Sequence, residues 1–142
     1  MNVYSTLHET QLPRVSDSAI TSLFETCDAN KRKLILVWPQ TGDFDTMEYA
    51  WWLSRAQVHL KSLDLEVRAV AIGDIPAGQK FCNYTGFPAQ HLFVDAEASL
   101  HRELDLYKGL TAKLPGLNPR QNGYLNLLLM CAGIGSPGTL KD

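Results

Sequence analysis

The sequence predicts an α/β fold with a mostly parallel central sheet and helices on both faces. Three short apolar runs, rich in branched residues and too brief for helices, are typical of strands: 34–38 (LILVW), 67–72 (VRAVAI) and 92–94 (LFV). The first two runs show little alternation of apolar and polar residues, as expected of parallel strands covered on both faces. A long helical pattern lies between them, so we expect a strand-helix-strand unit with a right-handed crossover.

The size of the chain fits one domain. With 142 residues, 45% of them apolar and 20% charged, we predict that residues 1–142 form a single domain. About two thirds of the unfolded surface can be buried at this length, so the core needs neither disulfides nor a structural metal.

Charge and hydropathy indicate which classes of partner and which cellular compartment to expect. The formal charge is -2, from 13 Lys+Arg and 15 Asp+Glu, and no basic block is present, so nucleic acid is not an expected partner. No run approaches the roughly eighteen apolar residues of a membrane span, and the N-terminal residues lack a secretion signal. We therefore expect a cytoplasmic protein without a membrane span.

The crossover helix is expected over about Thr46–Ser62, with Asp45 as its N-cap. One apolar stripe that can lie on a sheet follows alternating steps of four and three residues: Tyr49, Leu53, Ala56, Leu60 and Leu63. Met47, Trp51 and Val58 fall on the opposite side. A helix that is apolar on both sides is either sandwiched within its own domain, which is the more common case, or offered to a partner. In the second case these three residues are the partner-binding face.

The two ends of the chain are less regular. Residues 1–30 form either a hairpin turning at Ser16–Ser18 followed by a short helix near 23–27, which we prefer, or a helix capped by Ser16 that runs to about Asp28. Between the strands and the C-terminus, short helices are expected around Cys82 and after Asp95. A leucine-rich helix over 119–134 is expected to be buried on most sides.

Ligands of an open parallel sheet gather beyond the carboxyl ends of its strands, which here means the loop 38–46. That loop contains no cysteine. Cys27, Cys82 and Cys131 are widely spaced, without a C-x-x-C pair, and are expected to be free thiols. Asp43 and Asp45 fit helix capping better than acid-base chemistry. No histidine or cysteine spacing fits a metal site, and no cofactor is expected.

Several strings together resemble a known family. FCNYTGFP at 81–88, LFVD at 92–95 and LHREL at 100–104, in this order after the strand-helix-strand unit, resemble the peroxiredoxin-like branch of the AhpC/TSA family, which has a thioredoxin fold. The strings WPQTGDFDTMEYAWWL and MCAGIGSPGTLK resemble an AhpC/TSA-like group found in photosynthetic organisms, which makes the chloroplast stroma the alternative compartment. The resemblance covers about 34–142.

The resemblance bears directly on activity. In redox-active relatives the active loop carries a glycine followed by cysteine positions, and matching Gly42 to that glycine puts Asp43 and Thr46 at the cysteine positions. A carboxylate cannot attack a peroxide or a disulfide sulfur, because the thiolate is the nucleophile in such reactions. Peroxidase chemistry by this loop is therefore not expected.

Two functional hypotheses follow. The first, which we favour, is a thioredoxin-fold module without catalysis that binds a protein partner or a second copy through the Asp43 loop and the Trp51 face. The second is a thiol-dependent, peroxiredoxin-like antioxidant oxidoreductase that uses Cys82. A thioredoxin-like sheet carries a hairpin near its C-terminus, and none is evident after Val94. The sheet edge or the helix around Leu127 would then need a partner to cover it.

Overall fold

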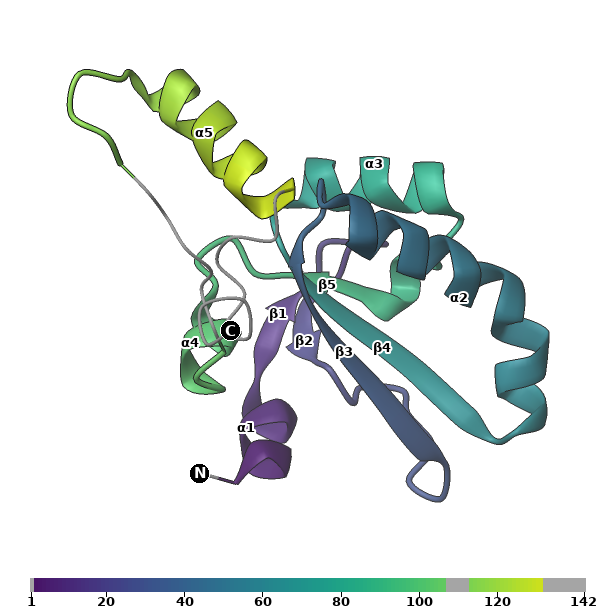
Figure 1. The fold of residues 1–142 in the computed structure, drawn as a ribbon. Coiled ribbons are helices and arrows are strands. Elements are labelled where there is room, and N and C mark those ends of the chain that lie inside the picture. Colours follow the sequence, from purple (N-terminus) through teal and green to yellow (C-terminus); the bar gives the residue numbers. More distant parts are fainter. Residues whose placement is uncertain (1, 107–112, 132–142) are drawn as a thin grey trace, which may run out of the picture. The chain divides into compact units, whose positions relative to one another are not determined.

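The computed structural model describes residues 2–106 and 113–131, and of Met130 and Cys131 only the backbone. The chain forms two compact units, Met1–Asp105 and Leu106–Asp142. In the first unit, helices lie on both faces of a central sheet (Figure 1). The predicted α/β architecture is confirmed, whereas the single domain stays a prediction.

The central sheet has the order β3-β4-β5, formed by β3 (Arg32–Gln40), β4 (Leu65–Ile72) and β5 (Leu92–Val94). All its strands are parallel, and the register pairs Leu34 with Val67 and Val70 with Phe93. These are the strands expected from the apolar runs, with β3 and β4 extended at their ends. Among the described residues, no strand pairs with the outer edge of β3.

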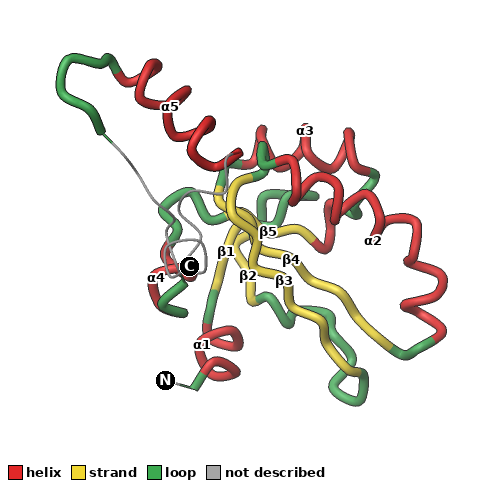
Figure 2. Tube along the Cα trace, in the orientation of Figure 1, coloured by secondary structure: helices red, strands yellow, loops and turns green. Residues whose placement is uncertain are grey.

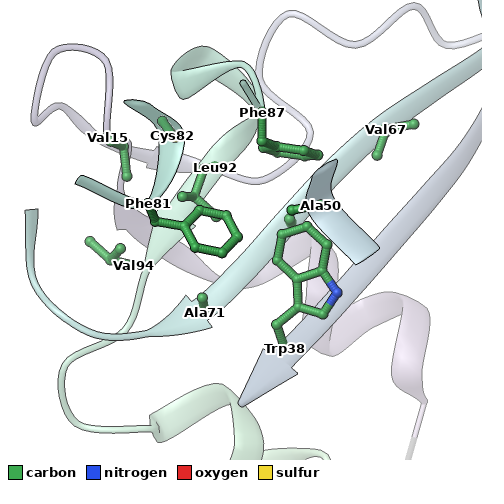
Figure 3. Close-up of a cluster of buried hydrophobic side chains, with 11 residues drawn as sticks. Val15, Trp38, Ala50, Val67, Ala71, Phe81, Cys82, Phe87, Leu92 and Val94 are labelled. Carbon is green, nitrogen blue, oxygen red and sulfur yellow. The ribbon is translucent and has the colours of Figure 1, made fainter. Parts of the chain in front are cut away.

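Helices α2 (Phe44–Ser62) and α3 (Ile75–Thr85) cover one face of this sheet. Figure 3 shows most of the side chains buried there, which come from both helices, all three strands, the N-terminal segment and the loop after α3: Val15, Trp38, Ala50, Val67, Ala69, Ala71, Phe81, Cys82, Phe87, Leu92 and Val94. Gly78 of α3 makes the closest approach. A Cβ there would meet Cγ2 of Val15 at 2.7 Å and Cγ1 of Val94 at 3.0 Å, so glycine sets the spacing between α3 and β5.

The other face of the sheet is covered by the shorter helices α1 (Val3–Glu9) and α4 (Ser99–Glu103) and by the antiparallel pair β1 (Gln11–Pro13) and β2 (Ile20–Ser22). In Figure 2 these two helices are red and these two strands are yellow. The residues buried on this side are Leu12, Leu23, Val70, Phe93 and Leu100. Burial of β4 on both faces explains its nearly continuous apolar run.

The N-terminal region differs in part from the sequence prediction. The hairpin around Ser16–Ser18 is confirmed by the pairing of β1 with β2. The short helix expected near 23–27 is wrong, because this segment forms turns, and Thr26 has a left-handed φ of 63° that a helix cannot continue through. Helix α1 was not expected. It is started by Asn2, whose side chain accepts hydrogen bonds from the amides of Tyr4 and Ser5.

The crossover helix begins earlier than expected. Asp43, not Asp45, is the N-cap, and Asp45 already lies in the first turn. The face toward the sheet is correspondingly rotated: it contains Thr46, Ala50, Leu53 and Leu60, while Tyr49 and Leu63 of the predicted stripe are exposed. The error arose because a helix with apolar residues on several sides allows more than one stripe.

In the second unit, α5 spans Pro119–Cys131, which confirms the predicted helix for its described part. Tyr124, Leu127 and Leu128 are exposed, whereas Leu125 and Leu129 are half-buried, so the expected burial on most sides is wrong for the described part of this helix. Within the described ranges no helix has the length and apolar character to cross a membrane.

Candidate functional site

The end of β3 is held from both faces of the sheet. The Trp38 ring is buried and makes an edge contact with Phe87, with ring centroids 5.2 Å apart, and a tilted contact with Phe81 at 5.7 Å. From the opposite face, Nε2 of His101 in α4 lies at hydrogen-bonding distance, 2.8 Å, from the Trp38 carbonyl oxygen. The loop that follows therefore starts from a fixed point.

This loop, Thr41–Asp43, joins β3 to α2 at the carboxyl end of the sheet. The Thr41 amide donates to the Ile72 carbonyl at 3.2 Å, which ties the loop to the neighbouring strand. Oδ2 of Asp43 accepts hydrogen bonds from the Thr46 amide at 2.9 Å and from the Thr46 hydroxyl at 2.8 Å. The Asp43 carboxylate and the buried Thr46 side chain thus form a helix cap, which uses Oδ2 of Asp43 and the amide and hydroxyl of Thr46.

Gly42 is exposed between these anchored residues. A Cβ at this position would meet nothing within 4 Å, and its backbone is not in the left-handed region. Neither packing nor backbone geometry explains the glycine, so the loop could accept a side chain here.

Cys82 lies on the buried side of α3. The residue is 8% exposed and belongs to the same apolar cluster as Val15 and Leu92, where Figure 3 shows it. Burial raises the pKa of its thiol to about 11. Thiol rather than thiolate is therefore the state at neutral pH, and the sulfur is shielded from solvent.

Cys27 lies in the turn after β2 and is half-buried. Its Sγ is 4.0 Å from the Leu23 carbonyl oxygen, and burial, the largest cause, raises the pKa of this thiol as well. Cys27 and Cys82 are both free, as expected from their spacing. The Cys131 side chain lies outside the described residues.

The face of α2 turned away from the sheet is unusually rich in large side chains. Trp51 and Trp52 are 36% and 56% exposed, and their rings make an edge contact at 5.0 Å. The guanidinium carbon of Arg55 lies 3.5 Å from the centroid of the Trp51 ring, which is cation-π geometry. Phe44 at 75% and Val58 at 82% exposure extend the same side of the helix. We call Phe44, Trp51, Trp52, Arg55 and Val58 the outer face.

Two of the three predicted partner-binding residues lie on the same face of α2. Trp51 and Val58 lie on the outer face, but Met47 is half-buried and packs against the core beneath α2, so its assignment to that face is corrected. The sequence analysis missed Phe44, Trp52 and Arg55. A signal was present, since positions 44, 51, 55 and 58 follow helical steps of seven, four and three.

No group of three or more histidine, cysteine or acidic side chains is arranged to hold a metal ion anywhere in the described ranges.

Comparison of the sequence with models of known protein families identifies the family of this chain. A family model described as AhpC/TSA antioxidant enzyme matches residues 52–142. The chain belongs to this family. The match begins after the Asp43 loop, so membership in the AhpC/TSA family does not by itself assign a nucleophile to that loop.

Solved structures with the same fold include two peroxiredoxins. A Cys-to-Ser variant of peroxiredoxin Q from Xanthomonas campestris aligns with a TM-score of 0.62 at 18% identity, over 75% of this chain and 65% of that one. A Cys-to-Ser variant of PrxQ from Xylella fastidiosa aligns with a TM-score of 0.62 at 16% identity, over 90% of this chain and 92% of that one.

A third structure, DsbF from MTB in mixed oxidized and reduced forms, aligns with a TM-score of 0.57 at 13% identity, over 72% of this chain and 73% of that one. These likenesses establish a peroxiredoxin-like thioredoxin fold, as the resemblance implied. A search of curated protein sequences found no match.

Proposed function

We propose that this AhpC/TSA family member is a non-catalytic thioredoxin-fold module that binds another protein through the outer face of α2. The observation that carries the proposal is a contrast: of the two thiols whose side chains are described, Cys82 is buried, Cys27 is half-buried and both have raised pKa values, while the tryptophans and Arg55 of α2 are exposed. A redox enzyme of this fold needs the opposite arrangement, an accessible thiolate.

The chemistry of the loop supports this proposal. If Gly42 corresponds to the glycine of the redox loop, Asp43 and Thr46 stand at the cysteine positions and are joined to each other in the helix cap. A carboxylate and a hydroxyl in this arrangement stabilise the start of α2. Neither can form a disulfide or a sulfenic acid, so the loop has no redox cycle of its own.

The composition of the outer face supports protein binding. Single exposed apolar residues are ordinary, but Trp and Arg together are the residue types that most often dominate binding energy at interfaces. The contacts of Trp51 with Trp52 and Arg55 restrict all three side chains before binding. Such restriction lowers the entropy lost on association.

The test uses Trp51→Glu, with Tyr84→Glu as the matched control, because Tyr84 is an exposed aromatic residue on a different helix, α3, and is not part of the outer face. Light scattering measures self-association, and co-purification from the source organism followed by reconstitution measures a partner complex. We expect Trp51→Glu to abolish the complex at an unchanged melting temperature and Tyr84→Glu to leave it intact. A complex that survives Trp51→Glu contradicts the proposal.

A second candidate is thiol-dependent peroxide reduction through Cys82, favoured by the family description and by the peroxiredoxin-like fold. Peroxide consumption with dithiothreitol or thioredoxin as reductant tests it. Turnover that disappears in Cys82→Ser supports the enzyme. Equal background consumption by the natural chain and by a variant with all three cysteines changed to serine supports the binding module.

The finer assignment to a group from photosynthetic organisms rests on the two strings WPQTGDFDTMEYAWWL and MCAGIGSPGTLK alone. It stays a prediction, and it indicates where the partner is to be sought.

A further inference from the structure

We propose that a cavity at the end of the sheet opposite the Asp43 loop binds a small organic carboxylate with an apolar body. The cavity has a volume of about 420 Å³, within the usual range for small-molecule sites. It lies beside the first half of β4, and β5 pairs only with Ala69–Ala71, so that the edge of β4 before Ala69 is not covered by β5. The second half of α2 and the segment from Phe87 to His91 form other walls.

Arg68 is the central observation. It lines the cavity, yet the residue is only 5% exposed and interrupts the apolar run of β4. Its Nη1 donates to the Val67 carbonyl at 3.0 Å. Within the described part of the chain, the ion pairs closer than 4.0 Å are those of Arg14, so no carboxylate lies that close to the Arg68 guanidinium. A buried cation is costly unless an anion and further hydrogen bonds compensate it.

The other charged groups around the cavity add to this positive charge. Lys31 and Lys61 line it together with Arg68, against Asp64 and Glu66. One carboxylate is already engaged, since Oε2 of Glu66 accepts the Asp28 amide hydrogen at 3.1 Å. The cationic side chains therefore outnumber the carboxylates, and one of those carboxylates is directed to a turn.

His91 lines the same cavity and is exposed to the charges of these side chains. Burial lowers the pKa of this lining residue to about 4, and the positive charges of Arg68 and Lys61 lower it further against the opposing effect of Glu66. The imidazole is neutral at pH 7 and can donate or accept one hydrogen bond at each nitrogen according to its tautomer. It completes a polar end that suits an oxyanion.

The remaining walls are apolar and define the body of the ligand. They are formed by the side of α2 that faces the sheet, by the start of β4 and by the segment before β5: Leu53, Leu60, Leu65, Val67, Phe87 and Pro88. A guanidinium binds a carboxylate through two parallel hydrogen bonds, which fixes the head group, while the apolar walls accept a hydrocarbon chain. Inorganic phosphate has no hydrocarbon chain and so cannot use the apolar walls.

The test measures binding of octanoate, 1-octanol and inorganic phosphate to the full chain by calorimetry and by NMR. Octanoate is expected to bind, with octanol and phosphate at least about tenfold weaker, since a charge-assisted pair contributes on that order. Arg68→Met is expected to weaken octanoate about tenfold or more. Arg102→Met, which removes an exposed guanidinium on α4, is expected to change the affinity for octanoate less than twofold.

Three results would overturn the proposal. They are equal affinity for octanoate and octanol, octanoate binding that is unchanged in Arg68→Met, and phosphate binding without octanoate binding.

A second measurement covers the case in which Arg68→Met does not fold. In the natural chain, octanoate is expected to raise the pKa of His91 from its value of about 4, since the carboxylate offsets the charge of Arg68. Lys61→Met, at an exposed position on the rim, is expected to weaken octanoate severalfold. A His91 pKa that does not change with saturating octanoate overturns the proposal.

Discussion

The two faces of α2 use large side chains for opposite purposes. The inner face, with Ala50 completely buried beside Leu53 and Leu60, places small and medium residues against the sheet. The outer face carries the largest side chains of the helix in contact with solvent. Size therefore does not indicate which side of this helix faces the core. The inner face is limited by the space above β4, and that space admits alanine where the outer face has tryptophan.

The most severe way to break this asymmetry is to charge the inner face. Ala50→Glu would bury a carboxylate with no partner, and we expect the free energy of unfolding to fall by about 3 kcal/mol or more. Urea unfolding followed by circular dichroism measures the loss. Val58→Glu, two turns further on the outer face, is the control. Comparable losses in the two variants would show that the faces are not different.

A smaller effect comes from pH, through the cavity that the inner face lines in its second half. The folded pKa of His91, about 4, lies below its ordinary value of 6.5, so folding favours the neutral ring and protonation favours the unfolded chain. The contribution of His91 to stability is therefore complete above about pH 6.5 and is lost as the pH falls toward 4. Urea unfolding at several pH values, compared with His91→Gln, isolates it; parallel curves would contradict the assignment.

A third change affects both faces together, because it acts at the start of the helix. Asp43→Ala removes the acceptor of the Thr46 amide and hydroxyl, and we expect a loss of about 1 kcal/mol. Asp43→Asn retains a capping oxygen and is expected to lose less. Thermal unfolding distinguishes the two, and an equal loss in both would assign the effect to charge rather than to capping.

The smallest effect is expected on the outer face itself. Val58→Ala removes methyl groups from a residue that is 82% exposed, so stability should change by no more than about 0.5 kcal/mol. Differential scanning calorimetry measures this change. A loss above 1 kcal/mol would mean that Val58 is covered within the chain itself and would remove it from the outer face.

The sequence was informative where a pattern has one structural solution. The strands around Leu36, Val70 and Phe93 were predictable because short branched apolar runs permit little else. The face of α2 was not, since Tyr49, Trp51, Trp52 and Met47 offer apolar residues in several directions. Only contact with the sheet decides among them.

The candidate sites divide in the same way. The loop around Asp43 could be located from the order of elements, because parallel strands end at one edge. The cavity could not, since Lys31, Lys61, Arg68 and His91 come from separate segments that only the fold brings together. One signal was available: the arginine within the apolar run VRAVAI, because arginine is rarely buried in a covered strand unless an anion compensates its charge.

The contact at Gly78 has a consequence for the thiol one turn later. Because α3 rests directly on Val15 and Val94 there and Cys82 is only 8% exposed, we expect full exposure of the thiol to require local movement of this helix away from the sheet. The rate at which a thiol reagent labels Cys82 in the native protein then measures the local opening of α3, separately from global unfolding. Labelling of this buried cysteine thus reports on the dynamics of the fold.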